Sequence, residues 1–177
     1  MFAYPQQCVA ELDLTEGMRV ADFGAGSGFF AKAAAARVGH TGKVYAIEVQ
    51  KGLVKKLESE IAKEGISNME CIWGDVEKLH GRKLADKSMD AVIISNVLFQ
   101  AEDKIGLIDE ARRIIAKNGK ILLVDFYGSS SVAGPRGRDA VSAEKARELF
   151  ERRGFRISET ISPSDHQYGI IFTHESR

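Results

Sequence analysis

The stretch from Val20 to Phe30 holds the residues with the clearest potential for ligand binding. Asp22 stands two positions before a set of glycines that alternate with other residues. These glycines are Gly24, Gly26 and Gly28. Glycine adopts backbone conformations with positive φ and lets the main chain come close to a ligand. The pattern therefore indicates a binding loop, although an ordinary connection between a strand and a helix has the same composition.

The spacing and the charge of this loop indicate what it binds. Loops that hold the pyrophosphate of a dinucleotide follow the pattern G-x-G-x-x-G, whereas this loop reads G-x-G-x-G. A carboxylate at Asp22 would repel a pyrophosphate and attract a cationic group such as an ammonium. We therefore expect a cationic ligand without phosphates. The alternative for Asp22 is a structural carboxylate that accepts backbone N–H groups.

Two further acidic residues follow predicted strands. Glu48 stands 20 residues after Gly28 at the end of a strand predicted over 43–48, where a carboxylate can accept both hydroxyls of a ribose. Asp75 follows a strand predicted over 69–73; it could accept a hydrogen bond from an exocyclic amine while Val76 packs on a base. Asp75 could equally be a surface acid. The carboxyl ends of parallel strands share one edge of a sheet, so all these acids are expected along that edge.

Strand-like and helix-like segments alternate along the chain. Strands are predicted over 18–23, 43–48, 69–73, 91–95 and 120–127, and helices over 29–38, 52–63, 104–116 and 143–153. This alternation predicts βαβ units and a mostly parallel sheet. The chain is then expected to end in strands 155–161 and 170–173, whose connection opens with a turn at 162–165. Such a short connection requires an antiparallel pair. The Ser- and Gly-rich loop 128–138 is expected at the ligand-binding edge.

The composition limits the remaining classes of protein. The chain has 177 residues, with 25 Lys and Arg against 25 Asp and Glu. Its length suits one domain, 1–177, in which residues 1–14 are a candidate N-terminal lid. The balanced charge disfavours a nucleic-acid partner, and two cysteines are too few for a disulfide framework or a cysteine-rich metal site. No run approaches the roughly 20 apolar residues of a membrane span. We expect a cytoplasmic protein without a metal.

Five stretches taken together resemble the class I S-adenosylmethionine-dependent methyltransferases. They occur in the order of that family and lie between about residues 15 and 127, at 22–28, 44–48, 74–76, 90–96 and 111–125. The resemblance implies an α/β, Rossmann-like fold whose seven-stranded sheet has the order 3-2-1-4-5-7-6. It also implies that strand 7 is antiparallel and that helices cover both faces. The implied cofactor is S-adenosylmethionine, with S-adenosylhomocysteine as the product.

The resemblance also assigns roles to individual residues. Asp22 and the glycine loop would hold the methionine end of the cofactor, Glu48 the ribose, and Asp75 with Val76 the adenine. The stretch 95–97 would lie beneath the methionine end. The implied cofactor-binding residues are Asp22, Gly24, Ala25, Gly26, Ser27, Gly28, Phe29, Glu48, Val49, Asp75, Val76, Asn96 and Val97.

The methyl acceptor is expected to be a small molecule. The stretches 96–100 and 109–115 resemble the ubiquinone/menaquinone-biosynthesis and arsenite types of methyltransferase. The chain lacks the cysteine set of the arsenite type and the insertions that often build a substrate cap. The stretch 95–98 is not the N/D-P-P-Y/F motif of enzymes that methylate exocyclic amines of bases or glutamine side chains, and no Pro-Cys pair supplies a nucleophile for cytosine C5.

Several residues are candidates for contact with the acceptor. Methyl transfer is an in-line displacement that depends largely on positioning, so a general base is needed only for an acceptor that is protonated at the working pH. His166 is the predicted general base because its ordinary pKa of about 6.5 suits proton removal near neutrality. Tyr127 is the second predicted catalytic residue. The candidates for substrate contact are Phe99, Gln100, Tyr127, Arg136, His166 and Tyr168, and Phe2 and Tyr4 could fold over the cofactor.

Three other functions stay open at this point. One is a methyltransferase for RNA or protein, which a local cluster of arginines would favour: Arg136, Arg138, Arg147, Arg152 and Arg153. Another is a catalytically silent cofactor-binding subunit that activates a partner. An NAD-dependent oxidoreductase is disfavoured by the glycine spacing and by Asp22. Both a monomer and a homodimer are compatible with the sequence.

Overall fold

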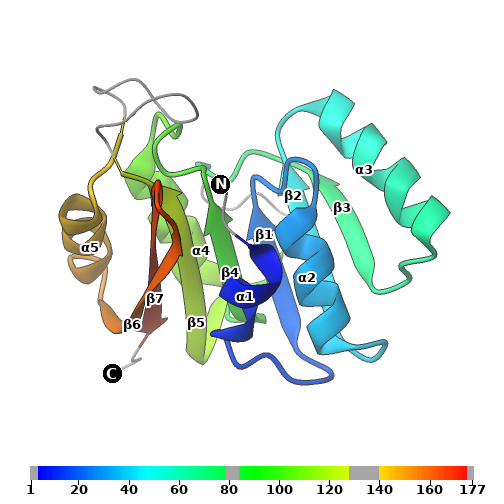
Figure 1. Ribbon diagram of the computed structural model, residues 1–177, viewed down its shortest axis with the longest axis horizontal. Helices are drawn as coiled ribbons and strands as arrows, with labels where there is room; N and C mark the ends of the chain where they lie inside the picture. Colours follow the sequence, from blue (N-terminus) through cyan, green and yellow to red (C-terminus); the bar gives the residue numbers. More distant parts are fainter. Residues whose placement is uncertain (1–3, 79–83, 128–139, 175–177) are drawn as a thin grey trace.

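The computed structural model describes residues 4–78, 84–127 and 140–174, and these form a sheet of seven strands between helices (Figure 1). The strand order is β3-β2-β1-β4-β5-β7-β6. Strands β1 to β5 pair in parallel, and β7 is antiparallel to both β5 and β6. The fold class and strand order expected from the sequence are thus confirmed. The strands are β1 Arg19–Phe23, β2 Lys43–Glu48, β3 Met69–Trp73, β4 Met89–Ser95, β5 Ile115–Phe126, β6 Phe155–Ser164 and β7 Gln167–His174.

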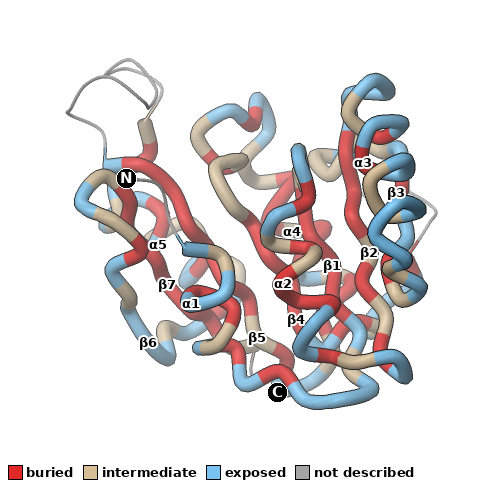
Figure 2. The backbone as a smooth tube through the Cα atoms, turned by 45° about the vertical axis from the view of Figure 1, so that its right-hand side comes forward, coloured by how far each residue is buried: buried red, intermediate tan, exposed pale blue. Residues whose placement is uncertain are grey.

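Helices cover both faces of the sheet. They are α1 Pro5–Ala10, α2 Phe29–Val38, α3 Lys51–Glu64, α4 Lys104–Ile114 and α5 Ala143–Glu151. Strand β4 explains the arrangement, because its side chains alternate between the two faces. Val92 packs in the cluster that contains buried apolar residues of α4 and α5, and Ile93 packs in the cluster that contains those of α1 and α2 together with Leu57 of α3. Both faces of the central strands are therefore buried, as Figure 2 shows for β1, β4 and β5.

The boundary between α4 and β5 differs from the prediction. The helix was expected to end at Ala116 and the strand to begin at Lys120, but α4 ends at Ile114 and β5 begins at Ile115. Ile115 pairs with Met89 of β4, and the register shifts before the pairing resumes at Lys120. Asn118, with φ of 65°, lies within this irregularity. Sheet pairing thus recruits residues whose local turn signal indicated a break.

The final hairpin is longer than predicted. Strand β6 continues to Ser164 and β7 begins at Gln167, so the predicted turn at 162–165 is displaced to residues 165 and 166. Pro163 lies in a register shift of β6, which is the edge strand of the sheet. An edge strand tolerates proline because the missing N–H is not required there, and a bulge accommodates it.

The N-terminal segment contains a helix that the sequence reasoning did not predict. Cys8 and Val9 on α1 are buried and belong to the cluster that α2 also lines. Tyr4 is exposed, and Phe2 lies outside the described residues, as do loop 128–138, Arg136 and Arg138. Within the described residues, no helix combines the length and the apolar character that crossing a bilayer requires.

Candidate active site

The glycine loop leaves β1 at Phe23 and packs tightly against two other segments. Gly24 has φ of 67°, and a Cβ atom there would lie 2.4 Å from Cγ2 of Val97, which follows β4. A Cβ at Gly28 would lie 2.4 Å from Cδ1 of Leu57 on α3. Gly26 differs, because the nearest atom to its Cβ position is 3.9 Å away. Packing therefore excludes side chains at the two ends of the loop, whereas Gly26 has open space beside it.

Asp22 is a buried acid at the end of β1 whose charge is only partly compensated. It is 2% exposed, and its Oδ2 atom has no hydrogen-bond partner in the described part of the chain. Burial raises the pKa of Asp22 to about 7, and the neighbouring carboxylate of Glu48 adds to the rise, while the backbone N–H of Ala31 in α2 opposes it. A buried carboxylate with one unpartnered oxygen is ready to receive a cation or a donor.

Glu48 ties the glycine loop to the end of β2. Its Oε2 accepts a hydrogen bond from the N–H of Gly26 at 3.0 Å, and its Oε1 accepts one from the N–H of Gln50 at 2.8 Å. The side chain is 6% exposed. Sequence reasoning assigned Glu48 to a ribose and missed this structural role. The two roles are compatible because each carboxylate oxygen can accept more than one hydrogen bond.

Asp75 and Val76 lie beside a separate, small cavity. Asp75 accepts a hydrogen bond from the N–H of Glu77 at 3.0 Å and lies 3.0 Å from Nζ of Lys78. Burial acts to raise the pKa of Asp75, but Lys78 and the Glu77 N–H outweigh it, so the pKa is lowered and the carboxylate is ionised at neutral pH. The cavity measures about 30 Å³. Its walls are Phe23, Ile47, Ile72, Gly74, Asp75, Val76, Leu84 and Glu110.

A main cavity of about 380 Å³ brings together much of the predicted cofactor site. Of the predicted set, the structure places these residues in its wall: Asp22, Gly24, Ala25, Gly26, Ser27, Phe29 and Asn96. The same wall contains Ser95, of the stretch expected beneath the methionine end, and Gln100, an acceptor candidate. Gly28, Glu48, Val49, Asp75, Val76 and Val97 do not line it. Pro5, Phe30 and Gln167 do, and sequence reasoning missed all three.

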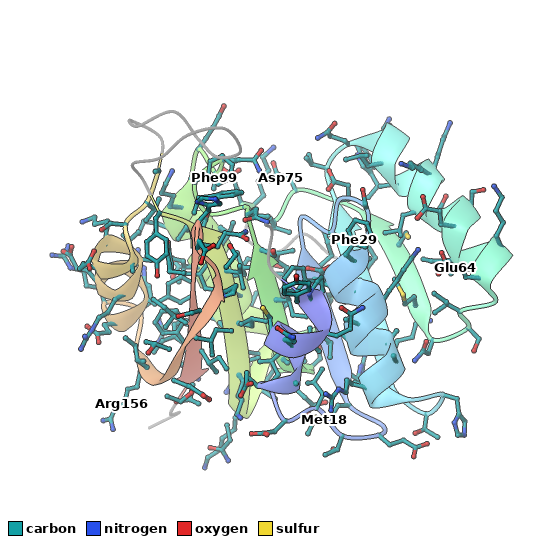
Figure 3. The ribbon with its side chains drawn as sticks, viewed as in Figure 1. Met18, Phe29, Glu64, Asp75, Phe99 and Arg156 are labelled. Atoms are coloured by element: carbon teal, nitrogen blue, oxygen red, sulfur yellow. The ribbon has the colours of Figure 1, made fainter. Side chains whose placement is uncertain are left out.

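The reasons for the misses differ. Phe30 follows Phe29 at the start of α2, so its position beside the loop was a usable signal. No local pattern distinguished Pro5. Gln167 reaches the cavity only because β7 lies beside β5 and pairs Gln167 with Phe126. Figure 3 shows the resulting edge, with Phe29, Asp75 and Phe99 toward the upper side of the sheet and Met18 and Arg156 at the opposite side.

A second cavity of about 570 Å³ follows β4. Its walls are Phe99, Gln100, Ala101, Glu102, Lys104, Ala140 and Val141. Gln100 lines both this second cavity and the main cavity. The two spaces are therefore neighbours on one edge of the sheet.

Asp125, at the end of β5, holds the segment that forms the wall of the second cavity. Its Oδ2 accepts a hydrogen bond from the N–H of Phe99 at 3.0 Å, and its Oδ1 accepts one from the N–H of Phe126 at 2.8 Å. The residue is fully buried, which raises its pKa to about 6 against the opposing effect of the Phe126 and Phe99 N–H groups and of Lys104. Sequence reasoning gave Asp125 no role.

Neither of the two predicted catalytic residues lines the main cavity. Tyr127 and Tyr168 line an outer cavity of about 290 Å³ between α5 and the β6–β7 hairpin, with ring centroids 5.7 Å apart. The hydroxyl of Tyr168 donates to the carbonyl of Val141 at 2.9 Å. His166 lies in the turn before β7, where its carbonyl accepts a hydrogen bond from the N–H of Tyr127 at 3.0 Å. The catalytic roles of His166 and Tyr127 stay predictions.

The arginine cluster is largely neutralised where the structure describes it. Arg136 and Arg138 lie outside the described residues. The other three arginines each form an ion pair with an acidic side chain: Arg147 with Glu151, Arg152 with Glu148 and Arg153 with Asp109. These pairs reduce the positive surface available to a polyanion.

Comparison with known proteins identifies the family. A family model described as "Methyltransferase domain" matches residues 14–159. The arsenite methyltransferase of Halobacterium salinarum is 29% identical over 168 residues, which cover 89% of this chain and 42% of that relative. The ubiquinone/menaquinone biosynthesis C-methyltransferase UbiE of Cupriavidus necator is 25% identical over 118 residues, which cover 67% of this chain and 47% of that relative. The chain thus spans less than half the length of these two relatives.

Solved structures show the same fold. A SAM-dependent methyltransferase from Aquifex aeolicus superimposes with a TM-score of 0.88 at 24% identity, covering 97% of this chain and 90% of that one. An arsenic(III) S-adenosylmethionine methyltransferase from Chlamydomonas reinhardtii gives a TM-score of 0.72 at 27% identity, covering 91% of this chain and 64% of that one.

The residues around the main cavity fit S-adenosylmethionine. The unpartnered Oδ2 of Asp22 would gain a partner from a ligand ammonium, and the open space beside Gly26 lets a ligand approach the loop backbone. No pyrophosphate is needed to explain any part of this site. Together with the family match and the fold, these features place the chain in the methyltransferase-domain family, among the class I S-adenosylmethionine-dependent methyltransferases.

Proposed function

We propose that this chain transfers a methyl group from S-adenosylmethionine to a small-molecule acceptor, which binds in the second cavity. The observation that carries the proposal is that Gln100 lines both cavities. A cofactor beside the glycine loop and an acceptor beside Phe99 would then be neighbours. The names of the relatives, which refer to arsenite and to quinone C-methylation, support a small acceptor.

The main contribution of the site to methyl transfer is to position the cofactor and the acceptor relative to each other. When bound, the cofactor supplies an electrophilic methyl group on a sulfonium. The Asp22 carboxylate offers a partner to the ammonium, and Phe29 and Phe30 contribute apolar walls to the main cavity. Asp125 accepts a hydrogen bond from the N–H of Phe99 and so holds a segment that lines the second cavity. Alignment of this kind accounts for a large part of the rate of a displacement reaction.

The cofactor assignment is tested by calorimetry with S-adenosylhomocysteine and with NAD. We expect wild-type protein to bind only S-adenosylhomocysteine, and Glu48→Ala to weaken that binding by roughly 10- to 100-fold, because hydrogen bonds to a charged group are worth about 1.5–3 kcal/mol. Glu70→Ala is the matched control, since Glu70 is an exposed acid paired with Lys43. Tight binding of NAD would overturn the assignment.

The activity is tested with a panel of small-molecule acceptors, scored by release of S-adenosylhomocysteine. Turnover with one chemical class would support the proposal and name the acceptor. Binding of S-adenosylhomocysteine without turnover on any small molecule would contradict it and favour a silent partner subunit. Turnover confined to RNA or protein would also contradict the proposed acceptor class; strong salt dependence of binding would distinguish RNA.

His166→Ala tests the predicted general base. We expect turnover to fall at least tenfold with an acceptor that must lose a proton, because general-base catalysis contributes about 10²–10⁴-fold. Affinity for S-adenosylhomocysteine should stay unchanged, since His166 does not line the main cavity. His40→Ala, at an exposed histidine beyond α2, is the control. Tyr127→Phe tests the phenol in the same assay. Unchanged turnover in either variant removes that residue from the mechanism.

A further inference from the structure

A buried amide from the last strand contacts the wall of the main cavity. Gln167 is 1% exposed and begins β7, where it pairs with Phe126 at the end of β5. Its Nε2 donates to Oδ1 of Asn96 at 2.6 Å, and its Oε1 accepts from Oγ of Ser164 at 3.2 Å. Both amides line the main cavity. The hairpin therefore reaches past β5 to a residue at the end of β4.

Asn96 itself is held in an unusual backbone conformation. Its φ is 57°, in the left-handed region that few non-glycine residues adopt. Its backbone N–H donates to the carbonyl of Val124 at 2.8 Å, and its own carbonyl accepts from Nε2 of Gln100 at 2.6 Å. The backbone of Asn96 is thus held on both sides, and its side-chain amide is oriented by its own hydrogen bonds. Its contact with Gln167 then decides which end of the amide faces the cavity.

The direction of the hydrogen bond from Gln167 to Asn96 leaves the Nδ2 group of Asn96 available as a donor. Because Oδ1 of Asn96 accepts from Gln167, the Nδ2 group lies on the other side of the amide. That group makes one long hydrogen bond of 3.3 Å, to Oγ of Ser95. Its second N–H has no acceptor among the residues that the structure describes. A ligand oxygen in the main cavity could accept from it.

We propose that Gln167 is a positioning residue that orients the Asn96 amide so that the main cavity presents an N–H donor at the end of β4. The cavity then offers an acceptor at Asp22 and a donor at Asn96. This pair is complementary to an amino-acid group, which carries an ammonium and a carboxylate. The inference rests on the proposed function, because it concerns recognition of the methionine end of the cofactor.

The test compares two ligands that differ in the amino-acid group. S-adenosylhomocysteine carries it, and 5′-methylthioadenosine lacks it. Calorimetry on wild-type protein comes first: if S-adenosylhomocysteine does not bind, the proposed function fails before the role of Gln167 is tested. Melting followed by circular dichroism confirms that each variant is folded. The ratio of the two affinities is then the measured quantity.

Three variants distinguish an effect on the orientation of the Asn96 amide from a general effect on the structure of the cavity. Gln167→Met keeps the volume but removes the donor to Asn96. Gln167→Glu accepts from Asn96 and so turns the Asn96 oxygen toward the cavity. Asn96→Asp keeps the contact with Gln167 but presents an oxygen to the ligand. We expect each to weaken S-adenosylhomocysteine binding about tenfold or more and to change 5′-methylthioadenosine binding less than about twofold. Gln7→Leu, at an exposed amide on α1, is the control.

Two outcomes would overturn the role of Gln167. Equal weakening of both ligands would mean that the contact only stabilises the cavity as a whole. Unchanged binding of S-adenosylhomocysteine in Gln167→Met and Asn96→Asp would mean that the orientation of the amide does not matter. If Gln167→Met fails to fold, Gln167→Glu still decides the question, because it keeps a hydrogen bond to the Asn96 amide and reverses its direction.

Discussion

Replacing Asp22 with asparagine is expected to weaken binding of S-adenosylhomocysteine by about 100-fold or more. Asp22 Oδ2 is buried without a partner in the described residues, and the proposed ammonium would be its counter-charge in the main cavity. Removing one member of a buried charge pair costs about 3–5 kcal/mol, and each 1.4 kcal/mol is a factor of ten in affinity. Calorimetry at about pH 8, where the wild-type carboxylate is ionised, measures the effect directly.

The same substitution should stabilise the protein when no ligand is bound. The folded-state pKa of Asp22 is about 7, raised from an ordinary value of 3.8. The folded protein therefore binds the proton more tightly than the unfolded chain does. The free energy of unfolding contributed by Asp22 is largest below about pH 4, falls as the pH rises to about 7 and is constant above that. An asparagine side chain does not titrate, so the variant should melt at a higher temperature than wild type above pH 7.

Melting curves at about pH 5, 7 and 8.5 test whether Asp22→Asn is more stable than the wild type as the pH rises. The pKa of Asp125 is raised to about 6, so Asp125 also makes the stability fall as the pH rises. The informative quantity is therefore the difference in melting temperature between the variant and the wild type at each pH. Affinity of the wild type for S-adenosylhomocysteine should rise with pH through about 7, and that rise should vanish in the variant. Asp13→Asn is the control, because it removes an equal charge at an exposed acid that pairs with Lys120. A variant that binds as tightly as wild type would refute the role of Asp22.

Replacing Gly24 with alanine is expected to destabilise the fold by roughly 2–5 kcal/mol and to abolish measurable cofactor binding. The left-handed conformation costs a residue with a Cβ about 1–2 kcal/mol, and overpacking adds roughly 1–3 kcal/mol. The added atom would lie 2.4 Å from Cγ2 of Val97, whose branched side chain turns poorly about χ1. Denaturant titration measures the free energy of unfolding, and calorimetry measures the binding.

Gly65 offers a control with the same backbone conformation. Its φ is also 67°, but nothing in the described structure lies within 4 Å of its Cβ position. Gly65→Ala should therefore cost only the conformational part, about 1–2 kcal/mol, and leave binding intact. The double variant Gly24→Ala, Val97→Ala should recover part of the lost stability. If Gly24→Ala and Gly65→Ala cost the same, the contact with Val97 does not restrict the loop.

The predictions that held share a local physical basis. Helix α2 and strands β2 and β3 begin and end where the sequence indicated, because apolar runs, glycines and charges define those segments without help from distant residues. The edge that collects the glycine loop and the acidic residues follows from parallel topology alone. Asp22 and Gly26 were therefore expected near each other, and both line the main cavity, while their contact with a cofactor stays a prediction.

The failures share a different basis. Pro163 marks a turn locally, yet the edge position of β6 lets the strand continue past it. Ile115 was predicted to be helical, but it pairs with Met89 of β4 and so belongs to β5. The hydrogen bond from Gly26 to Glu48 was missed because it depends on how the loop folds back, and the ribose role of Glu48 stays a prediction. In each case a long-range contact outweighed a local preference.

For this protein, residue type and spacing alone determined the class of fold, the loop and the kind of ligand, because each depends on neighbours in the chain. Only the tertiary structure decided that one oxygen of Asp22 lacks a partner within the described residues and that Gln100 lines two cavities. It also decided that Gln167 contacts Asn96, 71 positions away in the sequence. Those facts depend on which strands lie side by side and how their ends meet. Burial and pairing are properties of that assembly, and no short stretch of sequence contains them.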